Sequence, residues 1–212
     1  MNREVLLLGA GGHARVIIDT LQCLGVSILG VLDAAVEMHG QSILGVPVLG
    51  GDDLLADFSP SSVELVNGLG SIANTTARRG LFHRQKSQGF RFSTVVHPSA
   101  VVSPQAQLLE GAQVMAGAVI QTGCRIGVNV LVNTGALVDH DCTIGDHVHL
   151  APGVTLSGGV EIGDGVHVGT GATIIQGRHI GNESLVAAGA VVVDHVAMKT
   201  LVMGVPAREV MR

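Results

Sequence analysis

One histidine of this 212-residue chain stands between two carboxylates, in the run Asp139-His140-Asp141. An imidazole titrates near neutral pH, and an adjacent carboxylate can orient the ring and support its charged form. This arrangement suits a general base that takes a proton from an attacking nucleophile. The orienting carboxylate could be Asp139 or Asp141, and the spacing leaves both open. The simpler alternative is a solvated histidine with no chemical role.

A glycine-rich turn near the N-terminus is the second candidate site. The apolar run Glu4–Leu8 precedes Gly9-Ala10-Gly11-Gly12-His13-Ala14, an expected helix at about His13–Leu24 and a second apolar run, Ser27–Leu32, that ends at Asp33. Glycines let the backbone approach a ligand, and a helix N-terminus offers unpaired N–H groups to a phosphate. The pattern fits a dinucleotide site, a mononucleotide or nucleotide-sugar site, or a tight turn that binds nothing.

The rest of the first half predicts a small α/β unit over residues 1–95. Further strands are expected at Val46–Leu49, Val63–Val66 and Arg91–Val96, with helical segments around Asp52–Phe58 and Asn74–Gln88. Alternating strands and helices are typical of a parallel sheet. About 95 residues is roughly half of a full dinucleotide domain, which favours a half-Rossmann unit and a nucleotide-sugar ligand.

A six-residue repeat runs through the second half. Every sixth residue from Val96 to Val192 is Val, Ile or Leu, without an insertion, and a small or β-branched residue follows four positions later. Glycine recurs three positions after most of these aliphatic residues. A unit this short cannot bury its own apolar side, so successive units must stack. The repeat predicts a parallel β-helix with three flat faces and about 18 residues in each coil, in a domain over residues 96–212 that ends in a C-terminal cap.

Several residues depart from the repeat. Asn129, Asp141 and His147 stand in the glycine slot, where a corner requires a backbone conformation with positive φ. Cys124 and Cys142 occupy inward slots, where burial is expected. Arg178 also falls in an inward slot, and the pattern gives no account of it.

Composition excludes several classes of protein. A net charge of −5 with 12 Lys and Arg argues against a nucleic acid or an anionic membrane as partner. No apolar run is long enough to span a bilayer, and three cysteines form no pairing pattern. A cytoplasmic soluble protein is expected.

These motifs together resemble the hexapeptide-repeat sugar acetyltransferases of bacteria, in the branch of nucleotide-amino-sugar N-acetyltransferases and sialic acid O-acetyltransferases. The resemblance rests on the Gly9–His13 turn, on Asn133-Thr134, on the run Asp139-His140-Asp141-Cys142 and on the tail Gly204-Val205-Pro206-Ala207-Arg208. It implies a left-handed β-helix, a homotrimer, and acetyl-CoA bound in the clefts between neighbouring β-helices. The implied reaction is acetyl transfer to the amine of a nucleotide-linked amino-deoxy sugar for a bacterial surface glycan.

The resemblance also assigns roles to residues. His140 is implied as the general base and Asp141 as its orienter, and His149 or a backbone N–H would stabilise the oxyanion. The nucleotide sugar would contact Gly11, Gly12, His13, Asp33, Gly70 and Asn133, and acetyl-CoA would contact His149, Gly158, Thr170 and Ala188.

Three alternatives stay open. They are O-acetylation of a sialic-acid-type sugar, a nucleotide-sugar-binding protein without catalysis, and a zinc hydratase. His149 and His167 should stack one coil apart, but the histidine spacing does not match the zinc site of the carbonic anhydrases built on the same helix, so no metal is expected.

Overall fold

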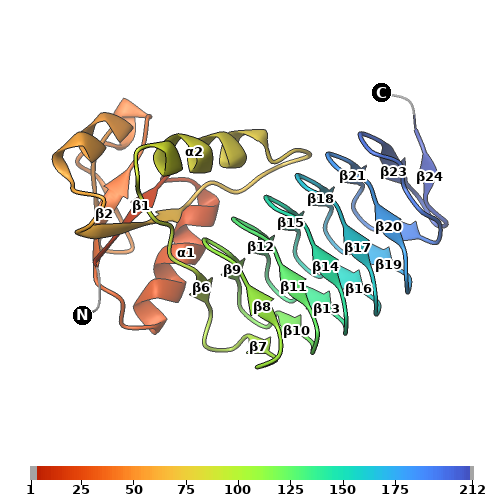
Figure 1. Cartoon of the computed structure of the whole chain (residues 1–212). Coiled ribbons are helices and arrows are strands. Elements are labelled where there is room, and N and C mark those ends of the chain that lie inside the picture. The colour runs from red at the N-terminus through yellow and green to blue at the C-terminus, as the bar shows by residue number, and fades with distance from the viewer. Residues whose placement is uncertain (1–3, 211–212) are drawn as a thin grey trace.

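The computed structural model describes residues 4–210 and shows an α/β unit followed by a regular stack of coils (Figure 1). Residues 1–3 and 211–212, at the outer ends of the two expected domains, lie outside the described residues. Within the described part, no helix is long and apolar enough to cross a membrane.

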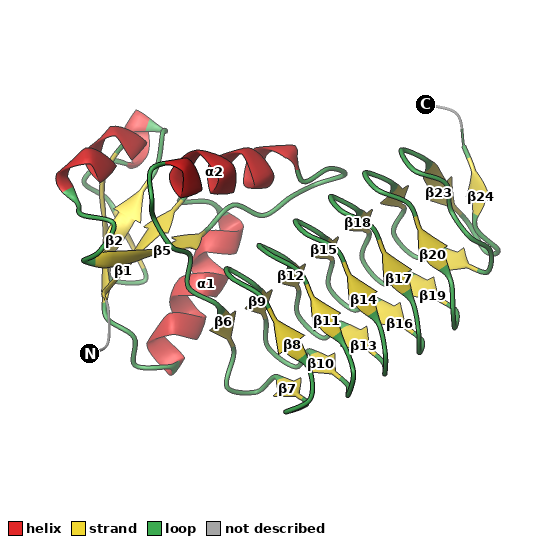
Figure 2. Ribbon diagram, viewed as in Figure 1, coloured by secondary structure: helices red, strands yellow, loops and turns green. Residues whose placement is uncertain are grey.

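The first unit is a five-stranded sheet with one helix on each face (Figure 2). Its strands are β1 (Glu4–Leu8), β2 (Ile28–Leu32), β3 (Ser42–Ile43), β4 (Val46–Gly50) and β5 (Val63–Asn67), in the order β3-β4-β2-β1-β5. The helices are α1 (Gly12–Cys23) and α2 (Thr76–Ser87), and two short 3₁₀ turns cover Val36–Met38 and Asp52–Asp57.

Strand β1 lies at the centre of this unit and is buried from both sides. Its residue Leu7 packs in the cluster that holds Ile17 of α1, and its residue Leu8 packs in the cluster that holds Phe82 of α2. Successive side chains of a strand point to opposite faces, so one apolar strand can anchor both helices. Burial of each such aliphatic side chain stabilises the folded protein by about 1.5–3 kcal/mol.

Two expectations for this unit need correction, and one is refined. The sheet is not entirely parallel, because β3 and β4 form an antiparallel hairpin. The helical segment expected around Asp52–Phe58 is a 3₁₀ helix over Asp52–Asp57. The run Arg91–Val96 is not one strand of the sheet: Phe92 makes a single bridge to Leu65, and the chain then crosses into the first coil. The Glu110 carboxylate accepts the Phe92 N–H at 2.9 Å and helps to direct that crossing.

The second unit is a left-handed parallel β-helix with three faces. Face 1 contains β6 (Val95–Val96), β9 (Gln113–Val114), β12 (Leu131–Val132), β15 (His149–Leu150), β18 (His167–Val168), β21 (Leu185–Val186), β23 (Leu201–Met203) and β24 (Arg208–Glu209). Face 2 contains β7 (Val101–Val102), β10 (Val119–Ile120), β13 (Leu137–Val138), β16 (Thr155–Leu156), β19 (Thr173–Ile174) and β22 (Val191–Val192). Face 3 contains β8 (Gln107–Leu108), β11 (Arg125–Ile126), β14 (Thr143–Ile144), β17 (Glu161–Ile162) and β20 (His179–Ile180).

The interior of the coils follows the sequence repeat. The aliphatic residues of the repeat and the small residues after them form one buried cluster, which includes Cys124 and Cys142. The corner residues Asn129, Asp141 and His147 have φ of 54°, 60° and 59°, as the glycine slot requires. The repeat therefore predicted both the core and the corners.

Arg178 is the inward position that the repeat placed wrongly. Its side chain is half-exposed, and its Nε donates to the carbonyl oxygen of Gln176 at 3.1 Å. A guanidinium without a counter-charge is costly to bury, so the side chain turns out of the coil while the backbone keeps the regular path.

The outer surfaces of the three faces differ in chemistry. Face 1 meets the α/β unit near the first coils (Figure 1). Face 3 presents mostly polar residues, from Gln107 to His179. Face 2 presents Val and Leu in its first coils, and Val101 and Leu137 are 63% and 42% exposed. Face 2 is therefore the apolar face that the chain itself leaves open.

Candidate active site

His140 lies at the corner where the chain passes from β13 on face 2 to β14 on face 3. Its Nδ1 donates to Oδ2 of Asp141 at 2.9 Å, whereas Asp139 accepts the backbone N–H of His140 at 2.8 Å. Asp141 is therefore the carboxylate that orients the ring. The hydrogen bond to Asp141 and then the charge of Asp139 raise the pKa of His140. Its Nε2 is left as the proton acceptor.

The residue one coil beyond His140 is Gly158, and the imidazole lies against its backbone. A Cβ at position 158 would be 2.5 Å from both Cε1 and Nε2 of His140. Only glycine leaves room for the ring in this position. Gly158, expected beside acetyl-CoA, thus lies next to the candidate base.

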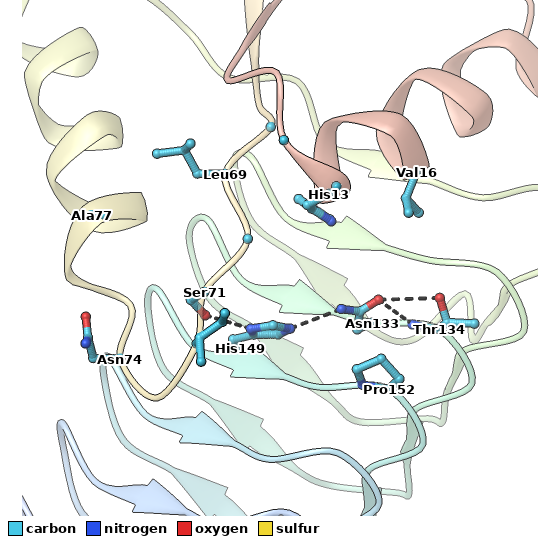
Figure 3. Close-up of a pocket in the computed structure, with 15 residues that line it drawn as sticks. His13, Val16, Leu69, Ser71, Asn74, Ala77, Asn133, Thr134, His149 and Pro152 are labelled. Carbon is cyan, nitrogen blue, oxygen red and sulfur yellow. Dashed lines mark hydrogen bonds between the residues drawn. The ribbon is translucent and has the colours of Figure 1, made fainter. Parts of the chain in front are cut away.

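A cavity of about 730 Å³ lies between the α/β unit and the β-helix (Figure 3). It contains five of the six residues expected at the nucleotide sugar, together with His149. The lining residues are Gly11, Gly12, His13, Val16, Gly68, Leu69, Gly70, Ser71, Ile72, Asn74, Ala77, Asn133, Thr134, His149 and Pro152.

The N-terminus of α1 opens into this cavity. Gly11 is the N-cap and makes no side-chain capping bond, and the first turn of the helix contains no acidic residue. The first N–H groups of a helix have no partner within it and attract anions. The turn can therefore receive a phosphate.

Asp33 does not line the cavity, although the sequence placed it with the nucleotide. One of its carboxylate oxygens accepts the N–H of Ala10 at 2.5 Å, and the other accepts the N–H of Ala35 at 2.8 Å. The carboxylate therefore stabilises the conformation of the glycine turn without lining the cavity.

A buried arginine that the sequence did not single out connects the two units. Arg78 of α2 is fully buried, and within the described residues it forms no ion pair. Its guanidinium donates to the carbonyl oxygens of Asn67, Leu69 and Asn129 and to the side chain of Gln113. Burial and then the charge of Arg78 lower the pKa of His13 to about 4. The cationic form of His13 is thus disfavoured.

Gln113 determines which ring nitrogen of His13 carries the proton. Oε1 of Gln113 accepts from Arg78 at 2.9 Å, so it must also be the acceptor for Nε2 of His13 at 2.9 Å. The neutral ring therefore carries its proton on Nε2, and Nδ1 is an acceptor. A run of polar residues in α2 gave no sign of this network, because only the packing of the two units buries it.

His149 stands on the outward side of face 1, as the repeat predicts, yet it is only 5% exposed. The segment 68–75, here called the strap, covers it on the way from β5 to α2 (Figure 3). Burial and then the neighbouring His167 lower the pKa of His149 to about 2. Its Nδ1 bonds Ser71 at 2.6 Å and its Nε2 bonds Asn133 at 3.1 Å.

The residues expected along acetyl-CoA lie on two different edges of the β-helix. Thr170 and Ala188 lie at the corner between faces 1 and 2. They continue, at one residue per coil, the line that begins with the cavity residues Thr134 and Pro152. Gly158 belongs to the corner between faces 2 and 3, with His140. The described chain thus places the cavity and the candidate base at opposite edges of face 2.

Two thiols, those of Cys124 and Cys142, lie close to the His140 corner but are buried inside the coils. Burial raises the pKa of Cys142, to about 11, and that of Cys124, so neither thiol is activated. In the described part of the chain, one group of three potential metal ligands lies together: Asp19, Cys23 and His97. Nδ1 of His97 already accepts the N–H of Ser99 at 3.0 Å.

Coils of this kind, with a general-base candidate at one corner and beside them a helix N-terminus that can receive a phosphate, are typical of a hexapeptide-repeat transferase. Comparison with known families supports this class. The PglD N-terminal domain matches residues 4–84, and the bacterial transferase hexapeptide (six repeats) matches residues 123–158. A comparison with curated protein sequences gave no significant match.

Solved structures match over the whole chain. A histidine variant of perosamine N-acetyltransferase from Caulobacter crescentus, in complex with CoA and GDP-perosamine, is 38% identical, with a TM-score of 0.92 over 99% of this chain and 97% of that one. The acetyltransferase domain of PglB from Neisseria gonorrhoeae, in complex with acetyl coenzyme A, is 35% identical, with a TM-score of 0.91 over 99% and 100% of the two chains. WeeI from Acinetobacter baumannii is 26% identical, with a TM-score of 0.87 over 98% and 100%.

The chain belongs to the hexapeptide-repeat acetyltransferases that carry a PglD-type N-terminal domain. It is an acetyltransferase, and the family expected from the sequence motifs is confirmed.

Proposed function

We propose that the enzyme transfers the acetyl group of acetyl-CoA to the amino group of a nucleotide-linked amino-deoxy sugar, in the synthesis of a bacterial surface glycan. One observation supports this function above the others: face 2 has an oriented, accessible His140 at one edge and a cavity that can receive an anion at the other. The Caulobacter relative, solved with CoA and GDP-perosamine, supports the same pair of substrates. The 1–95 unit then holds the nucleotide sugar, and the 96–212 unit carries the chemistry.

The cavity suggests how the nucleotide sugar is held. Its diphosphate lies at the N-terminus of α1, against the backbone of Gly11 and Gly12. His13 offers an acceptor at Nδ1, Gly70 allows close approach of the strap backbone, and Asn133 reaches the sugar. Asp33 acts indirectly, through the turn that it supports.

The chemistry follows from the free Nε2 of His140. The sugar amine attacks the thioester carbonyl, and Nε2 takes the proton that the amine loses. Asp141 stabilises the resulting imidazolium through Nδ1. The tetrahedral intermediate collapses, the C–S bond breaks, and CoA leaves as its thiolate, which the imidazolium can protonate. Because both ring nitrogens of His149 are bonded, a backbone N–H is the better oxyanion donor.

A complete site requires more than one protomer, and we propose the homotrimer typical of this architecture. The cavity and His140 lie at opposite edges of face 2, so one chain cannot bring them together. Packing of the apolar face 2 against a neighbour would place the cavity edge of one chain beside the His140 edge of the next. Gly158 from one chain would then meet Thr170 and Ala188 from the other along one bound acetyl-CoA. The free cysteines and the acetyl-CoA donor favour a cytoplasmic location.

Incubation with acetyl-CoA and a panel of UDP-, GDP-, dTDP- and CMP-linked sugars, with release of free thiol as the readout, tests the proposal. The expected result is thiol release with amino sugars and an N-acetylated product by mass spectrometry. Turnover of a sialic acid through its hydroxyl would overturn the amine as acceptor. Binding of a nucleotide sugar without thiol release, unchanged in His140→Ala, would overturn catalysis.

A further inference from the structure

The strap is fastened to the β-helix at two hydroxyl groups. Oγ of Ser71 lies 2.6 Å from Nδ1 of His149 and 3.3 Å from Nδ1 of His167. Four residues later, Oγ1 of Thr75 donates to the carbonyl oxygen of Gly165 at 3.3 Å. The residues between these points are exposed, and Ile72 is 91% exposed. The strap is thus an arch; of its two fastening residues, Ser71 lines the cavity and Thr75 does not.

The direction of each hydrogen bond at the Ser71 end follows from the amide of Asn133. The N–H of Thr134 donates to Oδ1 of Asn133 at 2.8 Å, which identifies that atom as the oxygen. The amide nitrogen, Nδ2, therefore donates to Nε2 of His149. The neutral imidazole then carries its proton on Nδ1 and donates it to Ser71, whose own proton goes to His167.

This chain of bonds leaves one donor unused at the cavity. Nδ2 of Asn133 carries two hydrogens, and His149 accepts only one of them. The second is free for a ligand, and its direction is set by the two bonds of the amide, one to His149 and one from the N–H of Thr134. The orientation of His149 in turn depends on Ser71, because Ser71 is the hydrogen-bond partner of its Nδ1.

We propose, on the basis of the function above, that Ser71 is a positioning residue for the nucleotide sugar. It acts through His149 to aim the free amide hydrogen of Asn133 at an oxygen of the sugar. Ser71 is not assigned as an acyl acceptor. His149 donates to its oxygen, and His167, which accepts its proton, is a weak base because burial lowers the pKa of that histidine. Binding of the acceptor depends on this chain of contacts, and the chemical step at His140 does not.

Steady-state kinetics of Ser71→Ala, Ser71→Thr and Thr75→Val tests the proposal, with the acceptor that turns over in the panel. Ser71→Ala should raise the KM for the nucleotide sugar about tenfold, as loss of one well-placed hydrogen bond does, and leave kcat and the KM for acetyl-CoA within about twofold. Ser71→Thr keeps the hydroxyl and should restore most of the loss. Thr75→Val removes the other fastening hydroxyl of the strap and should leave all three constants unchanged.

Two results would overturn the role of Ser71. One is an equal rise in KM for Thr75→Val, which would show general loosening of the strap. The other is acetylation of Ser71 on incubation with acetyl-CoA, detected by peptide mass spectrometry, which would make it a nucleophile. A binding measurement separates this proposal from the proposed function. If the wild-type enzyme acetylates no sugar, the proposed function fails. Calorimetric titration of the same variants with GDP-perosamine then still decides the role of Ser71. A tenfold weaker Kd in Ser71→Ala alone supports it, and equal Kd values overturn it.

Discussion

The ring of His140 rests on the backbone of Gly158, one coil along the same corner of the β-helix. In most of the repeat, the stacking of coils fixes where the backbone runs and leaves the corner side chains to solvent. Here the next coil forms a floor for the imidazole, while Asp141 holds it from the side at 2.9 Å. Two neighbours therefore limit the rotation of an exposed side chain, which is what a general base needs.

Gly158→Ala should inactivate the enzyme without unfolding it. The added methyl group would lie 2.5 Å from the ring atoms of His140, and an exposed imidazole at the end of a flexible side chain will move before the backbone does. We expect kcat to fall by roughly 100-fold or more, with little change in the KM for the nucleotide sugar. Gly80→Ala in α2, where the nearest atom would be 3.5 Å away, is the matched control and should keep full activity. An active Gly158→Ala enzyme would contradict the fixed position of the ring.

Asp141→Asn should shift the pH dependence of the reaction. Asp141 raises the pKa of His140, and the reaction needs the neutral imidazole, so kcat/KM should fall as pH drops below that raised pKa. Without the carboxylate, the acid limb should move to lower pH, while the plateau falls roughly 100-fold because the ring loses its orienter. Asparagine also accepts the positive φ of 60° at this corner, so the fold should be retained. An acid limb that stays in place would mean that another group titrates.

Gly11→Asp should separate stability from substrate binding. The N-cap has extended backbone angles of −79° and −167° with open space at its Cβ, so an aspartate can cap α1 and add a few tenths of a kcal/mol of stability. The same carboxylate would occupy the N–H groups that we assign to the diphosphate and would repel it. The KM for the nucleotide sugar should rise about tenfold or more. Gly11→Asn adds the cap without the charge, so its KM for the nucleotide sugar should lie between those of Gly11→Asp and the wild type. Equal KM values in the three proteins would mean that the phosphates bind elsewhere.

Arg78→Met should destabilise the protein by about 2 kcal/mol, measured by denaturant unfolding. Two effects oppose each other. The carbonyl oxygens of Leu69 and Asn129 lose the bond that Arg78 gives them, whereas the cost of burying a charge disappears. We expect the lost bonds to prevail and the pKa of His13 to rise from about 4, which an NMR titration would follow. The exposed Arg84→Met on the same helix should change stability by less than about 0.5 kcal/mol. A stabilised Arg78→Met protein would show that desolvation dominates.

The sequence predicted the features that depend on a local repeat. Coil interiors and corners follow from periodicity, because each six-residue unit meets an almost identical neighbour; Asp141 and His147 could thus be assigned positive φ in advance. The candidate base could be found for the same reason, as an imidazole beside a carboxylate is a local signal. The prediction that Arg178 points inward was wrong because the period gives the position of the backbone only. A long side chain can turn outward from an inward position.

Contacts between distant segments could not be predicted in this way. Arg78 meets Gln113 and Asn129 only because the α/β unit packs on face 1, and no spacing in the sequence reports that packing. The burial of His149 under the strap has the same origin. Arg91–Val96 was assigned to the wrong sheet since an apolar run does not say which neighbour it will pair with. Asp33 was expected at the ligand from a motif, while its carboxylate is used by the backbone.

Mixed oligomers should show whether one site is built from two chains. His140→Asn protomers keep a sound cavity, and Gly11→Asp protomers keep a sound base. At nucleotide-sugar concentrations well below KM, the first homo-oligomer should be nearly inactive and the second should keep about a tenth of wild-type activity or less. If the cavity of one chain faces His140 of the next, refolding the two together at equal amounts should restore about a quarter of wild-type activity, since a good site needs one chain of each kind in the right order. A mixture of His140→Asn with Asp141→Asn should restore nothing, because both defects fall on the same edge. Failure of the first mixture, with hetero-oligomers confirmed by native mass spectrometry, would place the complete site within a single chain and contradict the geometry at face 2.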